Sequence, residues 1–332
     1  MPNYNDGINF LKLIPKIYSY LSIEDEIIFI DDGSEDGSYE KITELVSNEK
    51  LLQVRVYQNE KNIGVVATEN IGASLAKGEY LYFAASDDDI SPHFFANSIN
   101  ALLNNPKAGV CSTASYLEYP DKIKIKLPIK GPSKKQIFLT AEQCQKYLIS
   151  NENWISGNSC IYRRKYFIDE GGFREELEGF CDVLLTLLIP IKYGAVFVPR
   201  VLTNFRLSKN SYASRHYKYE NIQLTMKIIE SVKVILEEQC GEEVANHWWV
   251  RNRTQILTSA ILKECINFFT FTNKVPLRLL ITDVFYLVKK SFFNKYFYFY
   301  VMKVLTLRRM RLENYAINKI FFYKKGNQEW TI

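Results

Sequence analysis

The sequence predicts an α/β fold with a mostly parallel sheet, followed by an α-helical extension. Between residues 26 and 86, short apolar segments typical of strands alternate with segments of helical periodicity, and the connections are short. Strand–helix–strand units of this kind have right-handed crossovers, which make the strands parallel. From about residue 217 the pattern becomes helical. With 47% hydrophobic and 24% charged residues, the 332-residue chain has the composition of an ordered globular protein.

The predicted elements of the first part follow one another closely. EIIFID at 26–31 is apolar and β-branched and ends on aspartates, which is typical of a buried strand. After the turn residues at 32–38, apolar side chains at helical spacing predict a helix. A strand at 51–59, a helix at 64–78 that ends on a glycine, and a strand at 79–86 complete the series.

Two acidic clusters follow predicted strands. Asp31 and Asp32 end the first strand, and Asp87, Asp88 and Asp89 follow the third. Because ligands of such sheets gather beyond the carboxyl ends of the strands, we expect both clusters to face one crevice. Clustered carboxylates repel one another unless a cation or hydrogen bonds compensate, and their oxygens suit Mg²⁺ or Mn²⁺ bound to a diphosphate. In the alternative interpretation, one aspartate caps the following helix and the others are solvated.

The cysteine pattern and the lengths of the apolar runs indicate the cellular compartment of the protein. The six cysteines have neither the C-x-x-C spacing of a zinc site nor the density of a disulfide scaffold, so we expect reduced thiols in a cytoplasmic protein. The first residues, MPNYNDG, lack the basic and apolar regions of a signal peptide. No uncharged apolar run reaches the roughly 18 residues of a membrane span. We therefore expect a protein that is soluble or lies on a membrane surface.

Four segments resemble the inverting family 2 glycosyltransferases and occur in that family's order. They are PNYNDG (2–7), EIIFIDDGSEDGS (26–38), NEKNIGVVATENIGASLAKGEYLYFAASDDD (59–89) and GGFREELEGFCDVLL (171–185). The resemblance covers about residues 1–215 and implies the Rossmann-like sheet of the glycosyltransferase A type. It also implies a nucleoside-diphosphate sugar as donor, with a lean towards a UDP-sugar, and Mg²⁺ or Mn²⁺ on the diphosphate.

The resemblance implies roles for individual residues of this chain. The nucleotide-binding set is Pro2, Tyr4, Asn5, Asp31, Asp32, Asn70 and Asp87. Asp87 and Asp88 match the end of the family's D-x-D element, which holds the metal. Arg206, Lys209 and Ser211, with Ser214 and His216 beyond them, fall in the loop that closes over the diphosphate.

Asp182 stands where the family places its general base, directly before an apolar helical run. Glu175, Glu176 and Glu178 are rival candidates nearby, and a solvated carboxylate at a helix start is the alternative interpretation of Asp182. In an inverting transfer, such a carboxylate takes the proton of the attacking acceptor hydroxyl, and no covalent nucleophile is needed.

The chain also departs from the family pattern. The family has a strand before the proline, whereas here Met1 stands directly before Pro2, so the first strand is expected to be missing or the start to lie upstream. Ala85 replaces the first aspartate of D-x-D, Glu69 stands where arginine is common, and Cys181 replaces the usual glutamate before the base.

The acceptor side is expected in the segment 151–167. Trp154 precedes a turn at Gly157 and Asn158, and these three residues are the predicted acceptor-binding set. An indole at this place can stack on a sugar ring, although an ordinary core position for Trp154 is equally consistent with the sequence.

The C-terminal segment combines basic and aromatic residues. Residues 271–332 hold 12 Lys or Arg against 3 Asp or Glu. Such a segment can lie on an anionic membrane surface, or it can pack on the catalytic part with its lysines in solvent. Nucleic-acid binding is disfavoured because no binding module accompanies the charge.

The sequence therefore predicts two domains. Residues 1–215 form a nucleotide-sugar-binding catalytic domain, with a donor part at about 1–110 and an acceptor part at about 111–215, and 216–332 form the helical extension. The expected function is glycosyl transfer to a glycan or lipid-linked acceptor in cell-surface polysaccharide synthesis, on the cytoplasmic side of the membrane. The alternatives are a non-catalytic binding or scaffold subunit and a nucleotidyltransferase. A nucleotidyltransferase is expected to have a phosphate-binding cation near its N-terminus, and this sequence has none there.

Overall fold

The structure is a computed structural model that describes residues 1–87, 89–118, 124–127, 131–150, 153–206, 222–253 and 256. The chain forms two compact units, of which the first comprises Met1–Ser214 and Ile228–Trp248 and the second Arg215–Lys227 and Trp249–Ile332. All strands of the described part belong to the first unit. Within that described part, no helix is both long and apolar enough to cross a membrane.

Strands and helices alternate through the first 103 residues. The elements are β1 (Pro2–Asn3), α1 (Gly7–Tyr18), β2 (Ile27–Asp31), α2 (Ser38–Asn48), β3 (Val54–Gln58), α3 (Val65–Leu75), β4 (Tyr80–Leu81), β5 (Asp89–Ile90) and α4 (Phe94–Leu103). The predicted strands at 26–31 and 51–59 and the predicted helices after them are confirmed. The third predicted strand is shorter than expected, because regular pairing stops after Leu81.

The remaining elements are less regular in order. They are β6 (Val110–Glu118), β7 (Lys124–Leu127), β8 (Ile137–Leu139), α5 (Ala141–Ser150), the 3₁₀ turn η1 (Gly157–Ser159), β9 (Cys160–Arg163), α6 (Arg164–Asp169), the 3₁₀ segment η2 (Glu175–Phe180), α7 (Cys181–Tyr193), β10 (Ala195–Arg206) and α9 (Ile222–Cys240). A further helical stretch spans 242–253.

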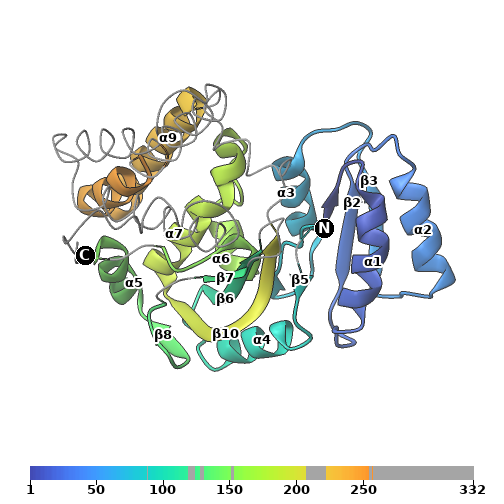
Figure 1. The fold of residues 1–332 in the computed structure, drawn as a ribbon, viewed down its shortest axis with the longest axis horizontal. Coiled ribbons are helices and arrows are strands. Elements are labelled where there is room, and N and C mark those ends of the chain that lie inside the picture. The colour runs from blue at the N-terminus through green and yellow to red at the C-terminus, as the bar shows by residue number, and fades with distance from the viewer. Residues whose placement is uncertain are drawn as a thin grey trace, which may run out of the picture. The chain divides into compact units, whose positions relative to one another are not determined.

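The first sheet is parallel, in the order β1-β2-β3. Helices α1 and α2 pack on one another, whereas α3 lies across the other face against β1 and β2 (Figure 1). The first strand is short but present, since Pro2 and Asn3 pair with Ile30 and Asp31. Met1 extends this pairing, because its carbonyl accepts a hydrogen bond from the Ile30 N–H at 3.0 Å. The first strand, which was expected to be missing, is therefore present but only two residues long.

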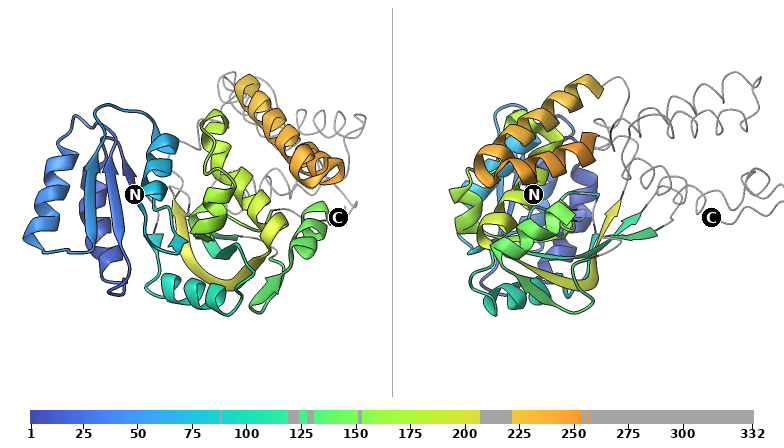
Figure 2. Two further views of the ribbon diagram at one scale, coloured as in Figure 1. Left: turned by 180° about the vertical axis from the view of Figure 1, so that it is seen from behind. Right: turned by 90° about the vertical axis from the view of Figure 1, so that its left-hand side faces the viewer.

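The second sheet is mixed, which the alternating pattern did not predict. Its order is β4-β9-β6-β10-β5, with β7 paired to β6 and β8 to β10. Strand β10 runs parallel to β6 and antiparallel to β5 and β8. Register shifts after Val198 and Val201 bend β10, and the curve is visible in Figures 1 and 2.

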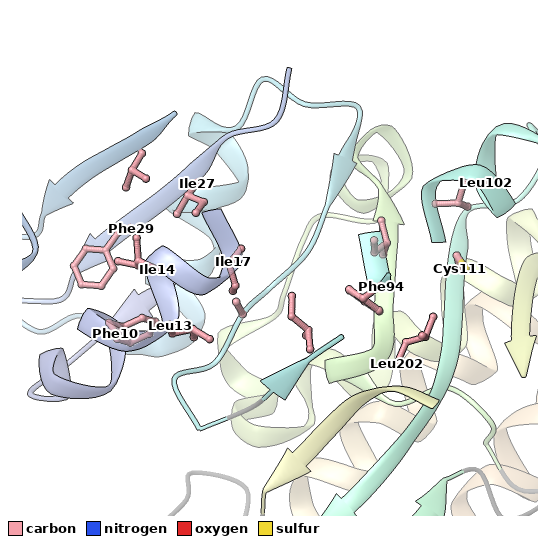
Figure 3. Close-up of a cluster of buried hydrophobic side chains, with 14 of the residues drawn as sticks. Phe10, Leu13, Ile14, Ile17, Ile27, Phe29, Phe94, Leu102, Cys111 and Leu202 are labelled. Atoms are coloured by element: carbon pink, nitrogen blue, oxygen red, sulfur yellow. The ribbon is translucent and has the colours of Figure 1, made fainter. Parts of the chain in front are cut away.

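One hydrophobic core joins the two sheets (Figure 3). The periodicity of α1 places Phe10, Leu13, Ile14 and Ile17 on its buried face, and Phe10 meets Phe29 of β2 edge-on at 5.2 Å between ring centroids. The same cluster continues through side chains of the second sheet and of α4, including Phe94, Leu102, Cys111 and Leu202. Burial of this apolar surface fixes the first sheet against the second.

Part of the predicted C-terminal extension, Ile228–Trp248, belongs to the first unit. In α9, the side chains of Ile228, Ile229, Val232 and Leu236 are buried. The carbonyl of Cys240 accepts a hydrogen bond from the Gln145 side chain of α5 at 3.3 Å. The basic segment 271–332 lies outside the described residues, so its contact with a membrane stays a prediction.

Replacing either of two glycines by alanine is expected to change the stability, in opposite directions. A Cβ on Gly109 would lie 2.6 Å from Cγ2 of Ile189, whereas a Cβ on Gly72, inside α3, would have its nearest contact at 3.6 Å from Ile30. We expect Gly109→Ala to lower the free energy of unfolding by about 1–3 kcal/mol through overpacking. Gly72→Ala should raise it by about 0.5–1 kcal/mol, because alanine favours helix. Denaturant unfolding measures both, and equal effects of the two variants would contradict the packing of β6 on α7.

Candidate active site

A polar cavity opens at the carboxyl ends of β1, β2 and β3. Its volume is about 420 Å³, and it is lined by Tyr4, Gly33, Ser34, Glu35, Gln58, Asn59, Glu60, Lys61 and Asn62. The Tyr4 ring is 50% exposed and available for stacking. The cavity therefore has the polar groups and the aromatic face that a nucleoside base requires.

Asp31 lies beneath the cavity lining. It is 0% exposed and accepts hydrogen bonds from the Asn3 side chain at 2.7 Å and from the Ser34 N–H at 2.9 Å. Gln58 of β3 donates a longer one, at 3.3 Å. Asp31 thus joins the ends of the three strands, and it shapes the predicted nucleotide site without being exposed in it.

Asp32 is the N-terminal anchor of helix α3. Its carboxylate accepts hydrogen bonds from the backbone N–H groups of Ile63 at 3.0 Å and Gly64 at 2.9 Å, and from the Asn59 side chain at 2.8 Å. Negative charge at this end of a helix is stabilising. Both predicted nucleotide carboxylates therefore contact backbone in this structure, and their direct contact with a nucleotide stays a prediction.

Asp87 faces the loop that follows β1. The Ser86 hydroxyl donates a hydrogen bond to the Asp6 carboxylate. Burial raises the pKa of Asp87, the nearby charge of Asp6 raises it further, and Arg206 opposes the rise. Asp88 lies outside the described residues.

The residues fit a metal that is held jointly with substrate. Among the residues that the structure describes, no group of three His, Cys, Asp or Glu side chains could enclose a metal ion. Mg²⁺ and Mn²⁺ commonly take one or two carboxylates and complete their coordination with water and substrate phosphate. Asp87 would supply one such oxygen ligand, so the donor set suits an ion on a diphosphate better than an all-protein site.

Strand pairing brings Arg206 close to Asp89. Asn204 of β10, two residues before Arg206, pairs with Asp89 of β5. Arg206 lies 3.4 Å from Asp89 and is 48% exposed, and Lys16 of α1 also pairs with Asp89. The predicted neighbours Lys209 and Ser211, with Ser214 and His216, lie outside the described residues.

Asp182 occupies the first turn of α7 and is half-buried. Burial raises its pKa to about 6, while backbone N–H groups at the helix start oppose the rise. A Cβ on Gly157 would lie 2.2 Å from its Oδ2, so the turn η1 packs directly on the carboxylate. The structure therefore brings Asp182 together with the predicted acceptor turn, where the Asn158 side chain also contacts Ser115 at 3.4 Å.

Two predicted site residues have structural contacts. Trp154 is 2% exposed and meets Phe197 edge-on at 5.5 Å, so its ring has no free face for a sugar, as in the alternative interpretation. Asn70 bonds both backbone groups of Phe173, donating to its carbonyl at 2.7 Å and accepting from its N–H at 2.9 Å. Asn70 thereby fixes α3 to the loop that leads towards α7.

Sequence reasoning missed several residues of the site. Asn3, Ser34 and Gln58 bond Asp31, and Asp6 lies beside Asp87. All four belong to the quoted segments or adjoin them, but nothing in their local pattern shows that they meet. Asn3 and Gln58 reach Asp31 by side-chain contacts between strands that are 27 or more residues apart, whereas the Ser34 N–H bonds Asp31 from three residues away.

The segment that leads into Asp182 contains a strained residue. Glu178, within η2, has φ 45° and ψ −124°, a conformation that glycine adopts more readily. We expect Glu178→Gly to raise the free energy of unfolding by about 1 kcal/mol. Glu176→Gly, at a neighbouring position without positive φ, should lower it by about 0.5–1 kcal/mol. Chemical denaturation compares them; a Glu178→Gly variant less stable than the wild type would contradict the strain.

The chain is similar in sequence to known proteins. Residues 1–170 match the family described as Glycosyl transferase family 2. The chain is also similar to a cholesterol galactosyltransferase of Borreliella burgdorferi, with 24% identity over 295 residues that cover 85% of this chain and 68% of that protein.

Two solved structures share the mixed α/β fold. S. aureus TarS 1–349 in complex with UDP-GlcNAc has a TM-score of 0.56 and 19% identity, covering 83% of this chain and 75% of that one. The mannosyltransferase PcManGT from Pyrobaculum calidifontis, in complex with GDP-Man and Mn²⁺, has a TM-score of 0.56 and 14% identity, covering 97% and 86%.

Proposed function

Because the chain belongs to glycosyl transferase family 2, we propose that it transfers a sugar from a nucleoside-diphosphate sugar to an acceptor hydroxyl with inversion at the anomeric carbon. The observation that carries this proposal is the contact between Asp182 and the turn at Gly157. It places a half-buried carboxylate beside the turn proposed for the acceptor, and a general base must lie within hydrogen-bond reach of the hydroxyl whose proton it takes.

Asp182 acts as the general base. A pKa of about 6 leaves its carboxylate mostly ionised at neutral pH and still basic enough to take a proton. The acceptor oxygen attacks the anomeric carbon as its proton moves to Asp182. The bond from that carbon to the diphosphate breaks, and the diphosphate leaves with the electron pair.

Charge on the leaving diphosphate is balanced near the acidic loop. Asp87 and Asp88 would hold Mg²⁺ or Mn²⁺, which supplies positive charge to the diphosphate. Arg206, half-exposed and near Asp87, is placed to contribute a second cation. Lys209 and Ser211 belong to the same proposed diphosphate set.

The cavity at the ends of β1–β3 is the proposed base site. Gln58 and Asn59 line the cavity, and because their amide N–H groups bond Asp31 and Asp32, it is their side-chain oxygens that can accept a hydrogen bond from the imide N–H of uracil, while Tyr4 offers a ring face. We therefore propose a UDP-sugar donor. TarS has been solved with UDP-GlcNAc and PcManGT with GDP-Man, so both bases occur among proteins with this fold.

For the acceptor, we propose a glycan or lipid-linked molecule of the cell surface. The basic and aromatic segment 271–332 supports this, since it suits peripheral contact with the anionic cytoplasmic face of a membrane. A non-catalytic binding subunit is the second candidate. It is favoured by Ala85 in place of a metal ligand, and the binding and activity measurements below distinguish the two.

UDP binding tests the metal site. We expect Mn²⁺ to tighten binding of UDP to the wild-type chain by at least about tenfold, because Asp87 and Asp88 would hold the ion and its positive charge would stabilise the diphosphate. The double variant Asp87→Ala/Asp88→Ala should lose this gain, whereas Asp169→Asn on α6 should keep it. Calorimetric titration with and without Mn²⁺ measures the effect. Metal-independent binding in the wild type would contradict the proposal.

Activity tests the base. We expect Asp182→Asn to lower turnover by about 10²- to 10⁴-fold with UDP affinity unchanged. Gly157→Ala should act similarly, since its Cβ would displace the carboxylate. Wild-type activity should rise as pH increases through about 6, where Asp182 loses its proton. Release of UDP from a panel of UDP-sugars gives the rates; a larger loss in Glu176→Gln than in Asp182→Asn would move the base to η2.

A further inference from the structure

Three charged side chains stand side by side across the second sheet. Glu118 ends β6, and the strand registers pair it with Lys124 of β7 and with Arg206 of β10. Residues that pair across neighbouring strands have their side chains on the same face of a sheet. The three residues therefore form a row in which one carboxylate lies between two cations.

The side-chain contacts follow this row. Oε2 of Glu118 lies 3.2 Å from Nζ of Lys124 and 3.9 Å from Nε of Arg206. The same oxygen accepts a hydrogen bond of 2.5 Å from the side-chain amide of Asn204. The side chain of Glu118 is 7% exposed, whereas those of Lys124 and Arg206 are 45% and 48% exposed. A buried carboxylate thus holds two cations that stay accessible to solvent.

The row carries more positive charge than its carboxylate needs. A carboxylate that is withdrawn from water requires partners, and Lys124 and the amide of Asn204 supply them to Glu118. Arg206 also contacts Asp89, but Asp89 pairs with Lys16 as well. Three cations and two carboxylates therefore alternate from α1 to β7, and this chain of contacts has a surplus of one positive charge.

The surplus charge lies next to the acidic loop that follows β4. Asp89, which Arg206 contacts at 3.4 Å, is two residues after Asp87, the proposed metal ligand. In the proposed function, the diphosphate of the donor brings negative charge to this place. Cations that are already held in position lose less side-chain entropy when they bind such a group than freely moving ones do.

We propose that Lys124 binds the diphosphate of the donor together with Arg206, and that Glu118 is the positioning residue that holds both cations for this contact. The assignment rests on the proposed function, in which the leaving diphosphate meets Arg206. It adds to the diphosphate site a lysine of β7, a strand that no part of the proposed mechanism uses. In the alternative interpretation, Lys124 only neutralises Glu118, and its loss changes stability without changing the affinity for phosphate.

Titrations with UDP and with uridine, at one concentration of Mn²⁺, test the role of Lys124. We expect Lys124→Gln to weaken binding of UDP by about tenfold, the effect of one lost charge-assisted contact. Binding of uridine should not change, because uridine carries no phosphate. Calorimetry measures UDP, and ligand-observed NMR measures the weaker uridine. A Lys124→Gln variant with the wild-type ratio of UDP to uridine affinity overturns the proposal.

Two matched variants accompany this test. Lys124→Arg keeps the positive charge and should restore most of the affinity for UDP. Lys146→Gln on α5 also removes a lysine that pairs with a glutamate, Glu142, but it does so at an exposed helical site. It should bind UDP as the wild type does. An equal loss in Lys146→Gln would mean that only the net charge of the protein matters, which also overturns the proposal.

The sign of the effect of Glu118→Gln tests the positioning role. The glutamine oxygen can still accept the hydrogen bond from Asn204, but it has no charge to hold the two cations. If Glu118 positions Lys124 and Arg206, UDP binding should weaken by at least about threefold. If Glu118 were only a negative charge near the site, its removal would tighten binding of the anionic UDP. Tighter or unchanged binding of UDP overturns the positioning role, and retained uridine binding shows that the variant is folded.

A double variant tests whether the two residues act together. In the Glu118→Gln background Lys124 is no longer held, so Lys124→Gln should weaken UDP binding by less than it does in the wild type. Losses that simply multiply overturn the coupling. If the wild type binds GDP in place of UDP, the same variants are compared with GDP and guanosine. A wild type that binds no nucleoside diphosphate contradicts the proposed function itself, whereas one that binds UDP as tightly as Lys124→Gln does removes only Lys124 from the site.

Discussion

The candidate site depends on the way Asp32 holds the start of α3. Its buried carboxylate accepts two backbone N–H groups at 3.0 and 2.9 Å and so fixes the helix to the end of β2. The helix carries Asn70, whose amide holds Phe173, and the chain continues from there through η2 into Asp182. Each link is a pair of short hydrogen bonds in a place with little competing water, where such bonds are strong. The nucleotide half and the acceptor half of the site are therefore positioned by one connected set of contacts that begins at a single carboxylate.

The three aspartates that follow β4 show how pairing separates chemically identical neighbours. Asp89 pairs with two cations, Lys16 and Arg206, because β5 lies beside β10 and near the end of α1. Asp87 has instead a carboxylate neighbour, Asp6, and burial raises its pKa. A site that concentrates negative charge in this way is stable only when some of its charge is neutralised by cations or protons. Asp89 is neutralised by the protein itself, whereas Asp87 remains available for an ion that arrives with substrate.

Local patterns predicted the parts of the fold that local contacts build. The alternation in residues 26–75 found β2, α2, β3 and α3, whose mutual contacts form over short separations. Helix α1 was not predicted, although its buried apolar side chains recur at helical spacing. The mixed second sheet was not predictable, because β6 pairs with β9 and β10 across 48 or more residues and nothing in their composition specifies the partner. Trp154 illustrates the same limit: the sequence allowed both a sugar platform and a core position, and only the contact with Phe197 separates them.

The candidate site also has one part built by the first sheet and another part that depends on the long-range pairings of the second. The cavity proposed for the base is lined by residues between 4 and 62, at the ends of the strands of the first sheet. Asp182, Gly157 and Arg206 depend on the second sheet, which must form its long-range pairings before Arg206 meets Asp89 and Gly157 packs on Asp182. Because loop closure over such separations is costly, the second half needs the buried core around Phe94 and Leu202 to hold it in register. In the proposed function, binding of the base therefore depends on contacts within the first sheet, whereas proton transfer to Asp182 depends on contacts that span the whole first unit.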